Sequence, residues 1–163
     1  HLEVAADSVV LNRACKVLER DYEEEFWFRG NGQVARHVKV SLEINAQEIV
    51  VEERWRPWIE LPLVLGNSWR DEFREQTVAF GDTILREVEI SGKVLSRETV
   101  LVPAGEFEEC YLVEIDLMEH TKSEIAGESS SRKILREWYG GDVGLVRFEE
   151  SGAVWELESY EVK

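Results

Sequence analysis

The chain has 163 residues, 44% hydrophobic and 33% charged, a balance that predicts one soluble globular domain over residues 1–163. Its 34 Asp and Glu outnumber its 19 Lys and Arg, for a formal net charge of −15. Such a surface repels phosphate backbones and anionic headgroups, which argues against nucleic-acid binding and stable membrane insertion, and it could attract a cation or a basic partner.

The first predicted element is a short amphipathic helix over residues 8–22, SVVLNRACKVLERDY. Its apolar residues at helical spacing are Leu11, Ala14, Cys15, Leu18 and Tyr22. Asp7 or Ser8 could cap it, since either offers a side-chain oxygen to the first-turn amides. The alternative is an edge strand, because the flanking sequence is typical of strands.

From residue 25 to residue 162 the hydrophobic period is two, which predicts antiparallel strands with one buried face and one wetter face. HVKVSLEI places on one face Val38, Val40, Leu42 and Ile44. EIVVEERW follows with three residues in phase, Ile49, Val51 and Trp55. YLVEIDL repeats the pattern with Tyr111, Val113, Ile115 and Leu117.

Turn signals separate these strands. They are Asn31-Gly32, Asn45-Ala46, Gly66-Asn67, Gly81-Asp82, Ser91-Gly92, Ala104-Gly105, Ala126-Gly127, Gly140-Gly141-Asp142 and Ser151-Gly152. No long helical pattern lies between them, so the strands are expected to form an up-and-down meander. About nine strands in one sheet would curl, so we expect a mainly β fold with a single, strongly curved antiparallel sheet, a half-barrel.

Three stretches need separate treatment. RWRPWIELPLVLGNSW (54–69) contains Pro57 and Pro62, which cannot donate to a central ladder, and is expected to cross the sheet. It would lay on the sheet Trp58, Leu61, Leu63, Leu65 and Trp69. HTKSEIAGESSSRK (120–133) is polar and predicts a flexible loop or a long hairpin tip. VPAGEF predicts a type I turn, with Pro103 and Gly105 in its second and fourth positions.

Three motifs occur in order: LPLVLGNSW, ETVLVPAGEFEECYLVEI and WYGGDVGLVRFEESGAVWELESY. Together they resemble, over residues 25–162, a TapB-like bacterial family of exported proteins and lipoproteins of unknown function. That family is similar in fold to the LolA-type lipoprotein carriers. The resemblance implies a LolA-like curved sheet and an extracytoplasmic location, in the periplasm or cell envelope, and brings no catalytic residue. One departure is that no lipobox cysteine is present, since Cys15 has no apolar signal segment before it.

The two cysteines, Cys15 and Cys110, match no CxxC redox or zinc pattern. Each is expected to be a small buried hydrophobic residue. A disulfide between them, closing a long loop, is the alternative in an oxidising compartment.

The sequence predicts no catalytic centre, no metal site and no cofactor. Histidine is limited to His1, His37 and His120. DLMEHTKS brings four polar residues close in sequence, Asp116, Glu119, His120 and Ser123, but a strand would divide them between two faces. No GxSxG elbow, HExxH helix, calcium loop or phosphate-binding glycine loop occurs. Pairs of carboxylates leave a small carboxylate-based enzyme in a barrel mouth as an alternative.

Aromatic residues are the most suggestive feature, with six Trp, six Phe and four Tyr. They could fill the core, or line an apolar cleft on the concave face of the sheet. The best candidates for ligand binding are Trp55, Trp58 and Trp69. We therefore expect a non-enzymatic envelope protein that binds a hydrophobic small molecule or a peptide segment. An interaction or assembly module that uses an exposed strand edge is the alternative.

Overall fold

The structure is a computed structural model that describes residues 2–20, 23–141 and 143–159. Every regular element in these ranges is a strand, so none of them contains a helix long and apolar enough to cross a membrane. The strands of this described part are β1 (Leu2–Val10), β2 (Arg13–Arg20), β3 (Glu23–Gly30), β4 (Gln33–Ile44), β5 (Gln47–Glu60), β6 (Ser68–Ala79), β7 (Asp82–Val102), β8 (Gly105–Ser123), β9 (Gly127–Gly140), β10 (Gly144–Glu150) and β11 (Ala153–Glu156).

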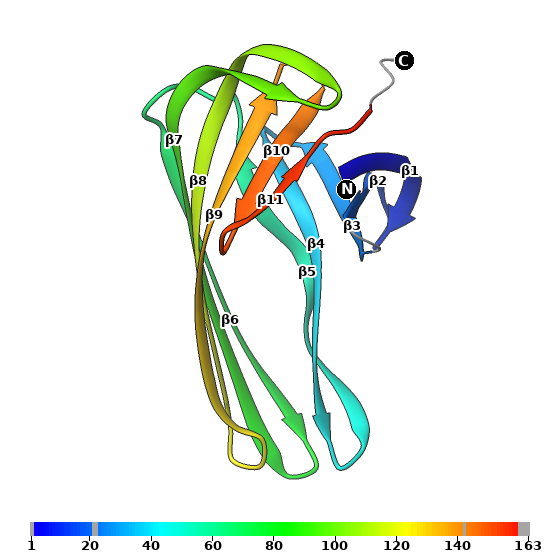
Figure 1. Ribbon diagram of the computed structural model, residues 1–163. Helices are drawn as coiled ribbons and strands as arrows, with labels where there is room; N and C mark the ends of the chain where they lie inside the picture. The colour runs from blue at the N-terminus through cyan, green and yellow to red at the C-terminus, as the bar shows by residue number, and fades with distance from the viewer. Residues whose placement is uncertain (1, 21–22, 142, 160–163) are drawn as a thin grey trace.

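The strands form two antiparallel sheets (Figure 1). Sheet A is a curled half-barrel of β1 to β5, and sheet B is an open sheet of β6 to β11, each a meander in chain order. The predicted meander and half-barrel are thus confirmed, but the prediction of a single sheet is wrong. Two sheets can bury their apolar faces against each other, whereas one open sheet of this length would leave a face exposed.

The chain changes sheets over residues 61–67, a shorter crossing than the predicted 54–69. Pro57 lies inside β5, where its missing N–H is tolerated because β5 is an edge strand of sheet A. After the crossing, Gly66 donates to the Val94 carbonyl and Val94 donates to Asn67. These bonds begin the ladder of sheet B.

The predicted helix over 8–22 is wrong, because β1 and β2 form a hairpin there. The alternative, an edge strand, is right in that the stretch is extended, but only Ser8 to Val10 belong to the edge strand β1, since β2 pairs with β3 as well as with β1. The turn residues Leu11 and Asn12 have φ of 46° and 60°. Cys15 and Val17 are buried two positions apart, so the period is that of a strand. Tyr22 of the expected helical stripe lies outside the described residues.

Most predicted turns are confirmed, including the one between Val102 and Gly105 that joins β7 to β8. Ser91-Gly92 is an exception, because both residues lie inside β7. The reason is packing: the Trp69 ring lies over Gly92, where a Cβ would be 2.1 Å from Cζ2 of the ring. The glycine thus allows a close approach between neighbouring strands.

The polar stretch 120–133 forms a hairpin, as one of its two interpretations predicted, and β8 and β9 continue through it to a turn at residues 124–126. Asp82, in β7, accepts hydrogen bonds from the Ser123 hydroxyl and from the Glu124 and Ile125 amides. These bonds, of which the one from Ser123 is the largest cause, hold the pKa of Asp82 below its ordinary value. They tie together the β6–β7 and β8–β9 ends of sheet B.

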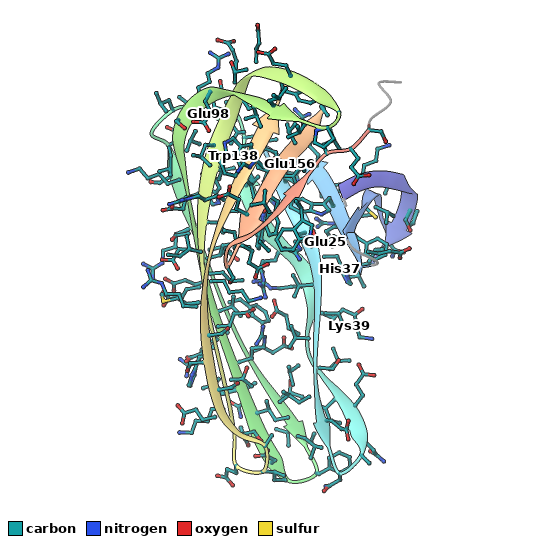
Figure 2. The ribbon with its side chains drawn as sticks, viewed as in Figure 1. Glu25, His37, Lys39, Glu98, Trp138 and Glu156 are labelled. Atoms are coloured by element: carbon teal, nitrogen blue, oxygen red, sulfur yellow. The ribbon has the colours of Figure 1, made fainter. Side chains whose placement is uncertain are left out.

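The main core lies between the sheets, and Figure 2 shows side chains of both sheets projecting into that space. It joins Trp58 and Ile59 of β5 to buried residues of sheet B, namely Val88, Ile90, Val94, Val113, Ile115, Leu117, Leu135 and Phe148. A second cluster at the other end of sheet B includes Cys110 and Trp138. Trp138 Nε1 donates there to Glu98 at 2.6 Å, and Figure 2 labels both residues.

Two register shifts in the β4–β5 ladder decide which β5 side chains face sheet B. Val51 and Trp58 have no Cα partner on β4, as expected for bulged residues. Ile49 and Val51 pack in one core cluster, but beyond the bulge Glu52 reaches sheet B. The expectation that Trp55 lies in phase with Val51 is therefore wrong, because a bulge shifts the period by one residue.

Candidate functional site

Trp58 is the central contact between the sheets. Its ring is 1% exposed, and Nε1 donates to both carboxyl oxygens of Glu137 in β9, at 3.0 Å each. At the second bulge, Trp58 and Ile59 both enter the core, which strict alternation would forbid. Trp58 therefore serves as a packed and hydrogen-bonded part of the core.

Glu137 is a buried carboxyl group, 1% exposed, that also accepts a hydrogen bond from the Tyr139 hydroxyl. Burial raises its pKa to about 7, and the negative charge of Glu25 adds to that rise. The bonds from Tyr139 and Trp58 and the charge of Arg36 work in the opposite direction. Near neutral pH this carboxyl lies close to its titration point.

Arg36 covers the same cluster from sheet A. Its guanidinium lies 5.0 Å from the centroid of the Trp58 ring and forms an ion pair with Glu25 at 2.8 Å. Glu25 also accepts a hydrogen bond from Trp27 Nε1 at 3.2 Å. The cluster thus combines charge pairing with cation–π contact at the junction of β3, β4, β5 and β9.

Trp69, at the start of β6, is half-buried and contacts Trp58 directly, because its Nε1 donates to the Trp58 carbonyl at 3.0 Å. It also borders a shallow hollow of about 520 Å³. The other lining residues are mostly polar, namely Ser68, Arg70, Ser91, Gly92, Lys93, Glu114 and Asp116. Four of these seven residues carry a charge, so the hollow is not a purely apolar site.

Trp55 lies apart from the other two predicted residues, in an aromatic cluster of sheet A. Its ring centroid is 5.6 Å from His37 and 5.9 Å from Phe28. Trp55 Nε1 and His37 Nε2 are buried without a hydrogen-bond partner. The structure thus brings Trp58 and Trp69 together but leaves Trp55 in a separate environment.

A buried ion cluster between the sheets was not predicted. Glu52 accepts from Arg56 at 2.9 Å and from Arg86 at 2.7 Å, and Arg86 donates to Glu119 and Thr121. Burial works to raise the pKa of Glu52, but the charge of Arg56 and the bond from Arg86 outweigh it, so the pKa lies below its ordinary value. The signal in the sequence is charged residues at alternate positions of EERWR, Glu52, Arg54 and Arg56, a pattern that also fits an exposed strand face.

These titratable groups lie in the interior of the described part of the chain, since Glu52 and Glu137 are each 1% exposed. Neither Glu137 nor Glu52 lines the hollow beside Trp69 or the one beside Val154. No group of three His, Cys, Asp or Glu side chains among the described residues could hold a metal ion. Cys15, in sheet A, and Cys110, in sheet B, are both buried and form no disulfide. What the buried polar groups do is hold sheet A against sheet B.

The strand edges are the remaining candidate. β6 has 12 residues and pairs along its whole length with β7, without a register shift. Among the described strands it has no partner on its other side. Its exposed face carries Arg70, Glu72 and Arg74, whose side chains are 59%, 64% and 70% exposed. β11, at the opposite edge of sheet B, has only four residues.

Comparison with known proteins finds one family match. The model of a domain family of unknown function, described as DUF3108-like, matches residues 62–162, which include all of sheet B. No curated protein and no solved structure gives a significant match.

Proposed function

The chain belongs to the DUF3108-like family, and we propose that it is a non-enzymatic cell-envelope protein that binds an extended segment of a partner along the free edge of β6. The observation that carries this proposal is the unpaired outer edge of a 12-residue strand. In strand addition the main chain supplies the affinity, and alternate side chains supply the specificity.

β6 has the properties that this binding mode needs. It contains no proline, and its ladder with β7 is regular, so alternate backbone N–H and C=O groups point outward along its length. Natural proteins usually protect a long edge with a bulge, a proline or a covering segment. On β6, Arg54 of β5 contacts Asp71 and Phe73 on the inner face, and the charged side chains Arg70, Glu72 and Arg74 occupy the exposed face. These charged side chains can also select a partner by charge.

Binding of a hydrophobic small molecule on a concave face has less support. Trp58 and Trp69 use their indole N–H groups within the protein, and Trp58 is enclosed in the main core. A ligand would have to displace these contacts. Strand addition at β6 needs no such rearrangement.

The envelope location and the relation to TapB-like proteins and LolA-type carriers also belong to the proposal. They rest on the three ordered motifs LPLVLGNSW, ETVLVPAGEFEECYLVEI and WYGGDVGLVRFEESGAVWELESY. The DUF3108-like match begins inside the first of these motifs and covers the other two. A curled half-barrel in sheet A is consistent with such a relation. The absence of enzymatic activity is proposed because the perturbed carboxyl group, Glu137, is enclosed by hydrogen bonds and packing.

Proline substitution can test the edge directly. Because β6 has no register shift, neighbouring residues alternate, and only one of the Arg74 and Glu75 amides points outward. Amide hydrogen exchange identifies that residue by its faster exchange. Peptides selected from a random library displayed on phage serve as the probe, with affinities measured by fluorescence anisotropy.

We expect the proline variant at the outward amide to bind selected peptides at least about tenfold more weakly, since the ring removes one donor and blocks close approach. Met118→Ala, on the exposed face of the interior strand β8, is the matched control and should retain binding. The proposed function would be refuted if the protein, at concentrations where it is a monomer, selects no peptide, or if proline substitution does not change the affinity for the selected peptides.

A further inference from the structure

We propose that the extended segment bound at this edge is β6 of a second copy, so that two chains form a dimer with Phe73 opposite its own counterpart. This inference rests on the proposed function, because it assigns a partner to the same edge. The dimer would join two copies of sheet B into one continuous antiparallel sheet across a two-fold axis perpendicular to it.

Symmetry restricts the possible registers. When two identical antiparallel strands pair across such an axis, one residue must face its own copy. Among residues 70–75, RDEFRE, every residue except Phe73 is charged and would face a like charge on the axis. Like charges directly opposite each other destabilise a strand pair, whereas an aromatic pair stabilises it.

The Phe73 register is also favourable on the exposed face of the sheet. It places Glu72 opposite Arg74 of the other copy, and symmetry repeats this pair. The neighbouring register, with Glu72 on the axis, would instead place Arg70 opposite Arg74 twice. Nearly the whole strand pairs in the Phe73 register, from Ser68 opposite Val78 onward, so few outward backbone groups remain unpaired.

On the inner face, the same register places Asp71 opposite Glu75 of the other copy. This pair of like charges has a cation beside it. Arg54 of β5 lies 3.4 Å from the Asp71 carboxylate, and its guanidinium is 4.1 Å from the Phe73 ring centroid. Two Arg54 side chains, one from each copy, therefore lie near the axis. Each also pairs with Glu52 at 3.2 Å, so together they offset part of the repulsion in the acidic pairs.

Charge exchange tests the register. Glu72→Arg and Arg74→Glu each create two like-charge pairs across the axis, and the double variant restores two unlike pairs. Both side chains are more than half exposed, so folding should be little affected. Sedimentation velocity over a concentration series measures the dimer dissociation constant. We expect it to rise at least about tenfold in each single variant and to return to within about threefold in the double variant.

Cysteine pairs test the geometry independently. Under mild oxidation, a mixture of the Glu72→Cys and Arg74→Cys proteins should form a cross-linked dimer faster than either protein alone, because the two positions face each other. Glu72→Cys crosslinking fastest by itself would indicate the neighbouring register and overturn this assignment. Cys15 and Cys110 are buried, and the unsubstituted protein controls for their reaction.

The outcomes separate the two proposals. If a dimer forms but its dissociation constant is the same in the charge-exchange variants, pairing through β6 is overturned. A monomer at every concentration that still binds library peptides at β6 refutes the dimer and leaves the proposed function intact. A monomer without edge-dependent peptide binding refutes both.

Discussion

Glu137→Gln tests the buried carboxyl group at the junction of the two sheets. The pKa of Glu137 is raised from 4.5 to about 7 by burial, so protons bind it more tightly in the folded state than in the unfolded state. The stability that this difference provides is fully present below pH 4.5 and is lost as the pH rises through about 7. Glutamine stays neutral and can still accept from Trp58 and Tyr139.

The magnitude follows from linkage. A difference of about 2.5 pKa units corresponds to about 3 kcal/mol, at 1.36 kcal/mol per unit. Relative to the unsubstituted protein, Glu137→Gln should therefore gain up to about 3 kcal/mol in free energy of unfolding between pH 4.5 and pH 8. Most of this gain should accumulate below pH 7, because above it both states of the unsubstituted protein are ionised.

Urea unfolding at several pH values and constant ionic strength measures this difference. Glu98→Gln is the matched control, since its carboxylate accepts an indole N–H from Trp138 but is exposed. It reports the effect of removing one negative charge from an acidic protein. If the unfolding free energies of Glu137→Gln and the unsubstituted protein run parallel from pH 4.5 to pH 8, the proposed linkage is incorrect.

Three further experiments test the interior contacts. Trp58→Phe should lower the free energy of unfolding by about 3 kcal/mol, because it removes one of the two side-chain donors of the buried Glu137 carboxyl and leaves a gap in the core. Trp55→Phe should lower it by at least about 1 kcal/mol less, since the Trp55 indole N–H has no hydrogen-bond partner; equal losses in chemical denaturation would contradict this. Gly92→Ala should lower the free energy of unfolding by about 2 kcal/mol, because the added Cβ collides with the Trp69 ring. In a double-mutant cycle, adding Trp69→Leu should recover part of that loss. Glu52→Gln should lower the free energy of unfolding by about 3 kcal/mol, because it leaves the buried guanidinium groups of Arg56 and Arg86 with Glu119 as their remaining carboxylate partner. A thermal unfolding midpoint unchanged from the unsubstituted protein would count against the ion cluster.

Much of the fold follows from local sequence, because alternation and turn chemistry act over a few residues. Asn31-Gly32 and Val102 to Gly105 lie at hairpin ends as predicted, since their residues suit the backbone conformations that turns require. The wrong prediction of a helix at 8–22 also came from local sequence. The apolar spacing there fits a helix, but Leu11 of the predicted apolar stripe is 50% exposed. Which β2 side chains are buried depends on the pairing of β2 with β3, which acts beyond the local sequence.

Less of the candidate site could be predicted from the sequence. Trp58 and Trp69 were named together and do contact each other, but their partners are a carboxyl group far along the chain and a backbone carbonyl. The free edge of β6 could not be located, because an edge is defined by which strands are missing beside it. That information exists only once the order of strands in the sheet is known.

The sequence by itself determined that this protein is built from antiparallel strands, where most of them turn, and that its surface is acidic, because period, turn residues and charge are local properties. Tertiary structure alone decided the division into two sheets and the two bulges in β5. It also decided the bond between Trp58 and Glu137, residues 79 positions apart. The physical reason is that a bulge moves every later side chain of the strand to the opposite face of the sheet. Where a bulge forms depends on which side chains pack across the core.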